Sequence, residues 1–359
     1  MMSENVKTNK ESFLDKVRDA LQSFGLPRMI IAAFLLLMFI IAPFTGASFW
    51  TQITNVVNRF SWNAVLVLAM VPMVHSGCGL NFGLPLGIIA GLLGATLSVE
   101  WGFTGPVSFL MAVLIATPFA LLFGVGYGWL LNKIKGGEMM IATYVGFSSV
   151  SFMCMMWLLL PYHKPDMVWG LSGKGLRTTI SLEGYYAGVL SKFMQIKIGD
   201  LVIPTGALLV FAVLAFLMWA FLHTKTGTAM TAVGSNANFA RAAGINIDRT
   251  RMLSVVMSTW LAAVGILMYE QGFGFIQLYM APFNMALPAV SAILIGGASV
   301  NKASIANVII GTILFQGIVT MTPTVMNSMI HMDISEVLRI IVSNGMILYA
   351  LTRKTEATR

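Results

Sequence analysis

The sequence predicts an all-α polytopic membrane protein with about ten transmembrane helices. Hydrophobic residues make up 57% of the 359 residues and charged residues only 10%, whereas soluble domains carry about 25% charged residues. The few charges also leave long gaps, such as Arg28 to Arg59 and Glu270 to Lys302. Each gap has room for one or two apolar segments of the roughly 20 residues that span a bilayer. This composition excludes an ordinary soluble enzyme, a disordered chain and a disulfide scaffold.

The apolar segments give the position of each helix, and the polar stretches between them give the loops. A cytoplasmic N-terminal segment, 1–28, precedes a transmembrane domain, 29–352, and a short cytoplasmic tail, 353–359. Two long polar loops interrupt the transmembrane domain, an outer one at 161–202 and an inner one at 223–251. The ten expected helices cover 29–49, 56–74, 84–98, 107–131, 139–160, 203–222, 252–271, 286–297, 304–322 and 334–352.

The basic residues predict which way the chain is inserted, because short cytoplasmic loops carry an excess of Lys and Arg. With the N-terminus inside, the inner segments hold fifteen of the 22 Lys and Arg residues, and five others all lie in the long loop 161–202. An even number of helices then puts both termini in the cytoplasm. The net charge of +8 is therefore explained by the basic cytoplasmic segments, and no nucleic-acid partner is expected.

The N-terminal segment contains one amphipathic stretch, 11–24. Phe13, Val17, Leu21 and Phe24 fall on a single helix face. An interfacial helix on the inner leaflet and a tail that is merely positioned before the first span are both compatible with this pattern.

The chain carries no catalytic or metal-binding motif. There is no HExxH, GxSxG or CxxC sequence and no phosphate-binding P-loop, which are the patterns that hydrolases, redox proteins and ATPases need. The four histidines are scattered, and the two cysteines, Cys78 and Cys154, lie in apolar surroundings. We therefore expect no catalytic residue, no metal and no cofactor in this chain.

Two glycine-rich stretches are expected to break the helices. Residues 76–87 carry four Gly and one Pro, and irregular backbone at membrane depth survives only where it is buried or lines a cavity. This stretch is a candidate for the transport path or for a tight hairpin. In 286–303, Pro288 and the pair Gly296-Gly297 are expected to bound a short helix. One break in each half is compatible with an inverted repeat.

The inner loop contains a short helix with start and stop signals. Ser235 or Asn236 can cap its N-terminus, the residues 236–243 are rich in Ala, and Gly244 is placed for the left-handed position at its end. Such a helix is suited to docking into a partner's groove, although an interfacial linker would have the same pattern.

The inner loop and its flanks resemble the cytoplasmic coupling segment of ABC importer permeases of the branched-chain amino acid and simple sugar class. Two more stretches resemble that family, Gly79-Leu80-Asn81-Phe82 and AVSAILIGGASV at 289–300. The resemblance covers about residues 56–352. The matching residues of the coupling segment are Gly234, Asn236, Ala240, Ala243, Gly244, Ile245 and Arg249.

The resemblance implies a permease subunit of an ATP-driven importer. It would form a homodimer or heterodimer with a second permease subunit, bind two cytoplasmic ATPases that hold ATP and Mg, and receive its small-molecule solute from a solute-binding protein outside the cell membrane. The residues expected to couple to the ATPase are Asn236, Asn238, Ala240, Arg241 and Gly244. For the translocation path we expect polar or aromatic groups on otherwise apolar spans, namely Asn81, Phe82, Thr143 and Ser148.

The solute class is expected to be a simple sugar, with nucleosides or branched-chain amino acids as alternatives within the same importer class. An ion-coupled secondary carrier is the main alternative of another class. It would commonly place Asp, Glu or His deep in its spans, and these spans are nearly free of such residues.

Overall fold

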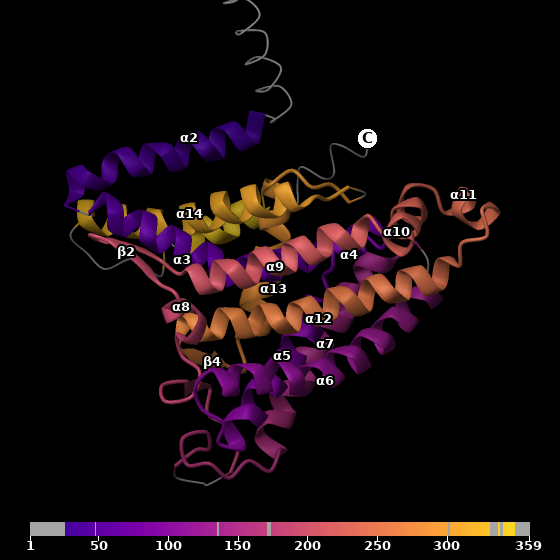
Figure 1. The fold of residues 1–359 in the computed structure, drawn as a ribbon, viewed down its shortest axis with the longest axis horizontal. Helices are drawn as coiled ribbons and strands as arrows, with labels where there is room; N and C mark the ends of the chain where they lie inside the picture. The colour runs from indigo at the N-terminus through magenta and orange to yellow at the C-terminus, as the bar shows by residue number, and fades with distance from the viewer. Residues whose placement is uncertain are drawn as a thin grey trace, which may run out of the picture.

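A computed structural model describes residues 26–46, 48–134, 136–170, 174–300, 302–330, 337 and 340–348. Long helices run roughly side by side along the long axis of the molecule, and short strands gather at one end (Figure 1). In chain order the helices and strands are α2 (Leu26–Ile41), η1 (Ala42–Thr45), α3 (Phe49–Leu68), α4 (Met70–His75), α5 (Leu84–Glu100), α6 (Gly105–Lys133), α7 (Glu138–Leu159), β1 (Thr179–Ser181), α8 (Val189–Lys192), β2 (Ile196–Ile198), β3 (Leu201–Ile203), α9 (Thr205–Leu222), α10 (Lys225–Ser235), α11 (Ala237–Ala242), α12 (Ile247–Phe273), β4 (Phe275–Gln277), α13 (Ala281–Ile295) and α14 (Ile305–Ile330).

The helical membrane class is confirmed. Among the described residues, six helices are long and apolar enough to cross a bilayer, and three more are apolar but shorter. The first nine predicted segments each overlap a helix, and the tenth is helical over its described residues 337 and 340–348. The number of ten crossings and the side of each terminus stay predictions. The amphipathic stretch 11–24 and the tail 353–359 lie outside the described residues.

Helix α12 lies at the centre of the bundle and packs against α3, α5 and α6. Glycines allow these helices to come close: a Cβ at Gly87 or Gly91 of α5 would meet the backbone of α12. A Cβ at Gly124 of α6 would lie 2.9 Å from the Cα of Val256 in α12. Close backbone approach of this kind lets helices associate in a membrane, where no hydrophobic force drives them together.

The long loop between α7 and α9 is folded onto one end of the bundle. Its strand β1 pairs with β4, which follows α12, in the antiparallel register Thr179↔Gln277. The side chain of Gln271 accepts hydrogen bonds from the backbone N–H groups of Leu190 (3.2 Å) and Ser191 (3.3 Å). The hydroxyl of the buried Tyr186 donates to Glu270. These contacts hold the loop against the end of α12.

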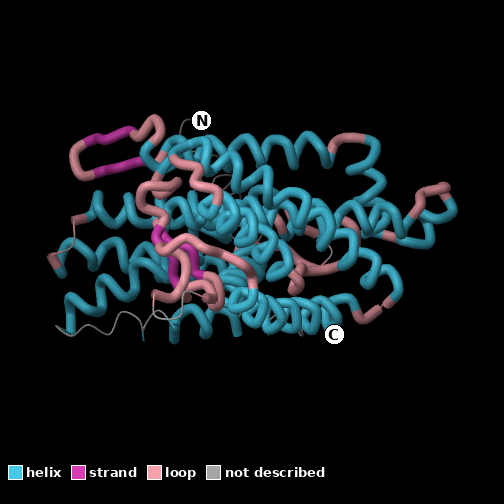
Figure 2. The backbone as a smooth tube through the Cα atoms, turned by 90° about the horizontal axis from the view of Figure 1, so that it is seen from below, coloured by secondary structure: helices cyan, strands magenta, loops and turns pink. Residues whose placement is uncertain are grey.

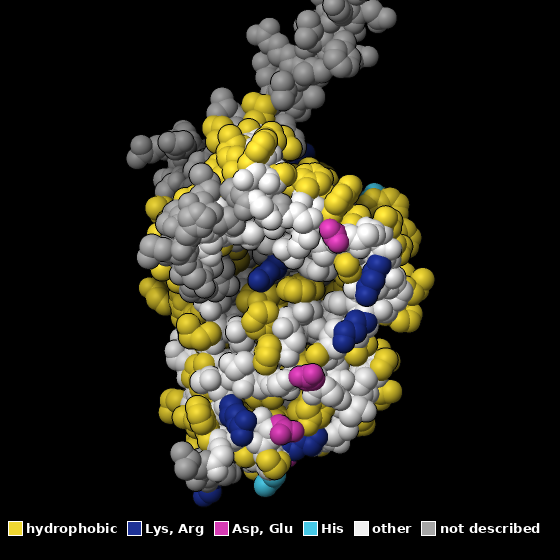
Figure 3. Space-filling model, turned by 90° about the vertical axis from the view of Figure 1, so that its left-hand side faces the viewer, with side chains coloured by type: hydrophobic (Ala, Val, Ile, Leu, Met, Phe, Trp, Pro, Cys, Tyr) yellow, Lys and Arg dark blue, Asp and Glu magenta, His cyan; other side chains and the backbone are white. Residues whose placement is uncertain are grey.

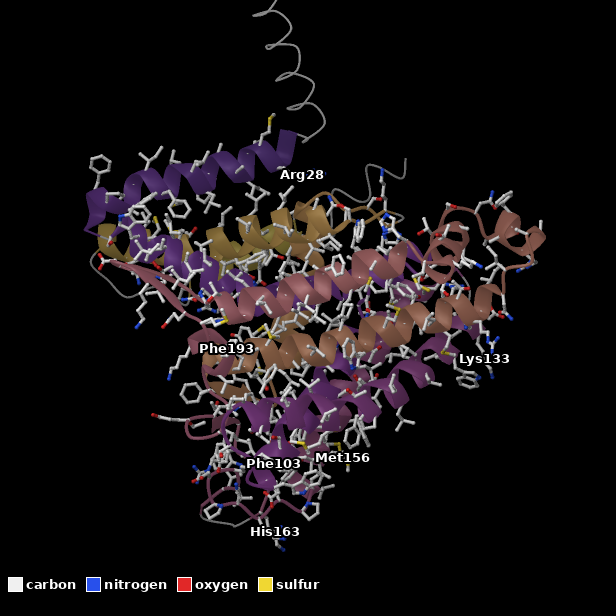
Figure 4. The ribbon with its side chains drawn as sticks, viewed as in Figure 1. Arg28, Phe103, Lys133, Met156, His163 and Phe193 are labelled. Atoms are coloured by element: carbon white, nitrogen blue, oxygen red, sulfur yellow. The ribbon has the colours of Figure 1, made fainter. Side chains whose placement is uncertain are left out.

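The helices α10 and α11 lie at one end of the bundle, and the strands lie at the other end (Figure 1). Lys133 lies at the end from which α10 and α11 project, whereas Phe103, His163 and Phe193 lie towards the end with the strands (Figure 4). Seen from the strand end, charged side chains are scattered over the face and hydrophobic side chains line its flanks (Figure 3). This end is called the loop end below, and the other is called the coupling end.

The first predicted break is confirmed, and the second needs a correction. Helix α4 ends at His75 and α5 begins at Leu84, so the irregular backbone covers 76–83. Pro288, however, lies inside α13 and does not bound it, because the helix begins at Ala281, five residues before the predicted start. The turn at Gly297, with φ +91°, does separate α13 from α14 as expected.

Candidate functional site

A helical hairpin forms the tip of the coupling end. Helix α10 is capped by the Thr224 side chain, which accepts a hydrogen bond from the N–H of Gly227. Helix α11 is capped by Asn236, whose Oδ1 accepts from the N–H of Phe239 at 3.0 Å. Gly244 follows with φ +78°, a left-handed conformation that favours glycine. The predicted cap at Asn236 and the predicted left-handed end at Gly244 are confirmed.

The expected ATPase-coupling residues fall into two groups. Asn236, Asn238, Arg241 and Gly244 are exposed. Ala240 is fully buried against Val233 and Ile247, so it holds the hairpin together. Their role in coupling stays a prediction.

Phe239 lies at this tip and is not among the residues expected from the sequence to contact the ATPase. Its side chain is 66% exposed, on a helix whose other exposed side chains are small or polar. A large exposed aromatic side chain on a projecting helix is a typical anchor for a protein partner. The signal in the sequence was the single aromatic residue within NANFARAA.

The hairpin is joined to the first break by close backbone contact. A Cβ at Gly77 would lie 3.0 Å from the Cα of Gly234 in α10. The His75 ring lies beside this contact, with Nδ1 3.1 Å from the Thr231 hydroxyl and Nε2 2.8 Å from the carbonyl oxygen of Ala303. His75 therefore links three segments: the end of α4, helix α10 and the turn that leads into α14.

The first break also contacts the starts of α7 and α12. Arg251 of α12 forms an ion pair with Glu138 of α7, and its Nε lies 3.2 Å from the sulfur of Cys78. Ser254 donates to the hydroxyl of Ser76 at 2.6 Å. Residues 75–83 are thus the point where the α10–α11 hairpin meets α12, the start of α7 at Met139 and the turn that leads into α14.

Asn81 lies within this break and is fully buried. Its Nδ2 donates to the Ser258 hydroxyl at 2.8 Å, and its Oδ1 accepts from the Tyr127 hydroxyl at 3.1 Å. Asn81 therefore ties the break to α6 and α12. Both of its polar ends are occupied by protein groups in this conformation.

The other expected path residues are spread around α7. Phe82 is half-buried, and its carbonyl oxygen would lie 2.8 Å from a Cβ at Gly146. Thr143 is half-buried and donates its hydroxyl to the carbonyl oxygen of Met139. Ser148 is exposed. The structure thus brings Phe82 against α7, while only Ser148 of the four lies on an open face. Their role in translocation stays a prediction.

The open face of α7 and α13 is distinguished by polar groups. Phe147 of α7 stacks on Phe283 of α13, with ring centroids 5.3 Å apart. Beside this pair the face exposes four polar side chains, those of Tyr144, Ser148, Ser151 and Asn284. We call these residues and the two stacked rings the α7–α13 face. Of its polar members, only Ser148 is expected from the sequence.

The open faces of α6 and α9 have no such groups. The exposed residues of α6 from Pro106 to Trp129 are apolar or glycine, and those of α9 from Leu209 to Trp219 are all apolar. Side chains of this kind suit contact with lipid. Polar side chains in spans usually face the protein interior or a water-filled cavity. The α7–α13 face is therefore the one suited to a partner subunit or an aqueous path.

Comparison with known proteins gives one family and several relatives. The model of the family "Branched-chain amino acid transport system / permease component" matches residues 52–351. The xylose transport system permease protein XylH of Haemophilus influenzae is 26% identical, over 90% of this chain and 94% of the relative. The galactofuranose transporter permease protein YtfT of Escherichia coli is 23% identical, over 82% of this chain and 81% of the relative. The nucleoside ABC transporter permease protein NupB of Lactococcus lactis is 26% identical over 52% of each chain.

Proposed function

Because the chain belongs to the family of permease components of branched-chain amino acid transport systems, we propose that it forms the solute path of an ATP-binding cassette importer for a simple sugar. It is a multi-pass protein of the cell membrane. The observation that carries the proposal is the capped helix α11 at the coupling end, linked through α10 to the break between α4 and α5. ATP is bound and hydrolysed by partner subunits.

The sugar assignment is supported by the relatives that match most of the chain. The xylose and galactofuranose permeases each match more than four-fifths of its length. The nucleoside permease matches about half, which makes nucleosides the second candidate, with branched-chain amino acids behind them. An ion-coupled carrier stays the alternative of another class.

We place the coupling end in the cytoplasm, because the predicted inner segments carry most of the Lys and Arg residues. The ATPase would then dock on the exposed groups of α11, namely Asn236, Asn238, Phe239 and Arg241. Closure of the ATPases would move α11 and α10, and the contact at Gly234 would pass the motion to the break. At the loop end, a solute-binding protein would deliver the sugar.

The translocation path would run along the α7–α13 face, opposite a second permease subunit. Hydroxyl and amide groups can exchange hydrogen bonds with a sugar, and aromatic rings can stack on its apolar face. Tyr144, Ser148, Ser151 and Asn284 supply the first kind of group, and the Phe147–Phe283 pair supplies the second.

The function is tested by reconstituting the tagged permease, its co-purified ATPase and its solute-binding protein in vesicles. We expect ATP-dependent uptake of one of a panel of radiolabelled pentoses and hexoses. Uptake of nucleosides or amino acids, with no uptake of sugars, would show that the solute is not a sugar. Uptake by the permease alone, driven by an ion gradient, would replace the importer with a secondary carrier.

The path is tested separately by introducing cysteines and adding a membrane-impermeant thiol reagent. Ser148→Cys and Asn284→Cys are expected to lose uptake on modification. Phe216→Cys, on the apolar open face of α9, is the matched control and should keep it. Loss of uptake only in the α9 variant would show that the translocation path does not run along the α7–α13 face.

A further inference from the structure

The strands β2 and β3 form a small hairpin with two chemically different faces. Its register pairs Ile196 with Ile203 and Ile198 with Leu201, while Lys197 pairs with Val202. Successive residues of a strand point to opposite faces. Four aliphatic side chains therefore share one face, and Lys197 lies on the other.

The hairpin is held at the rim of the loop end. The Thr54 hydroxyl of α3 accepts a hydrogen bond from the N–H of Val202 at 2.9 Å and donates to the carbonyl oxygen of Asp200 at 3.4 Å. At its other end, the N–H of Gly206 in α9 donates to the carbonyl oxygen of Phe193 at 3.1 Å. Figure 2 shows the hairpin at the edge of the helix bundle.

The apolar side of the hairpin is open. Ile196 is 48% exposed and Ile198 is 65% exposed, and the neighbouring Phe193 and Met194 are exposed to a similar extent. A group of large apolar side chains exposed together marks a surface that contacts another molecule or a membrane.

Three observations identify lipid as the occupant of this surface. The hairpin leads through Pro204 directly into α9, whose residues after Thr205 are all apolar or glycine and whose open face suits contact with lipid. Trp50, which is exposed, lies one helical turn from Thr54 on α3, and Trp is enriched at membrane interfaces. Lys192 and Lys197 complete the pattern, because interfacial segments combine apolar groups with basic ones.

The backbone sets the depth of the hairpin. A two-stranded sheet leaves unpaired N–H and C=O groups along its outer edges, and such groups are not tolerated in the hydrocarbon region. We propose that the β2–β3 hairpin lies in the headgroup region of the bilayer, with Ile196 and Ile198 towards the acyl chains and Lys197 towards the phosphates of anionic phospholipids.

The test is accessibility of spin labels in vesicles of phosphatidylethanolamine and phosphatidylglycerol. Single cysteines replace neighbouring residues, in Ile198→Cys and Lys197→Cys, in a Cys154→Ser background that keeps the buried Cys78. Leu209→Cys on α9 is the lipid reference, and Glu183→Cys in the exposed loop is the water reference. Both hairpin positions are exposed, so the labels leave the fold intact.

We expect the label at 198 to shift towards the lipid reference, with collisions favouring oxygen over a water-soluble nickel chelate. The label at 197 should shift towards the water reference. Equal access of the nickel chelate at both positions would overturn the proposal. So would a label at 198 that is shielded only after addition of the solute-binding protein, since the hairpin would then be a protein-docking surface. Neither outcome depends on which solute the protein carries.

Discussion

Gly234 of α10 lies so close to His75 that a Cβ at this glycine would overlap the His75 carbonyl oxygen. The imidazole ring of His75 forms hydrogen bonds with the Thr231 hydroxyl and with the Ala303 carbonyl oxygen in the turn before α14. The α10–α11 hairpin and the end of α4 therefore meet at Gly234 by direct backbone contact, with no side chain of residue 234 between them.

Gly234→Ala is expected to push α10 away from the break. Overpacking of a close contact costs about 1–3 kcal/mol, and we expect a lower unfolding temperature in detergent and a loss of uptake with the ATPase still bound. Gly126→Ala in α6 is the matched control, because nothing lies within 4 Å of a Cβ there. Normal uptake by Gly234→Ala would show that this contact does not carry the motion.

Glu138→Leu is expected to destabilise the coupling end by leaving the Arg251 guanidinium without its carboxylate. The two side chains are only 17% and 8% exposed, and removing one partner of a largely buried pair costs about 3–5 kcal/mol. The double variant Glu138→Leu with Arg251→Met should cost less than the sum of the single variants. A double-mutant cycle on thermal unfolding measures this difference, and additive costs would show that the pair is not coupled.

Asn81→Leu is expected to act on stability rather than on solute affinity. The substitution leaves the buried Tyr127 hydroxyl without its acceptor, which costs about 1–3 kcal/mol. Adding Tyr127→Phe should recover part of the loss. Thermal unfolding and the KM of uptake separate the two roles: a changed KM with unchanged stability would show that Asn81 contacts the solute, in agreement with its expected place on the translocation path.

Phe239→Ala is expected to weaken binding of the ATPase roughly 30-fold, which corresponds to about 2 kcal/mol for an aromatic anchor. The measurement is retention of the ATPase on the immobilised permease at increasing dilution. Phe44→Ala is the control, since that side chain is 86% exposed in η1, away from α11. Equal retention by both variants would remove Phe239 from the docking surface.

The sequence predicts the positions of the helices well, because each span has to be apolar along its whole length and charges interrupt it. It also predicts the local geometry of α11, since the cap at Asn236 and the left-handed Gly244 depend on neighbouring residues only. The predicted helix start at 286 is wrong because Pro288 does not bound the helix, and α13 continues on both sides of it.

The surroundings of the site could not be predicted in the same way. In a membrane, apolar side chains face both lipid and neighbouring helices, so polarity does not show which side of α7 is open. The partners of Asn81 come from α6 and α12, one of them 177 positions away in the chain. Such pairings depend on how helices are arranged, and a single sequence carries no local signal for them.

The pairing of β1 with β4 has a consequence for biosynthesis. Thr179 leaves the ribosome well before Gln277, its partner in the strand pair, and α9 to α12 are made in between. The loop before α9 therefore cannot form the β1–β4 pair until α12 and β4 have been made. A chain that ends before β4 would therefore lack this strand pair, and the segment at Thr179–Ser181 would have no strand to pair with.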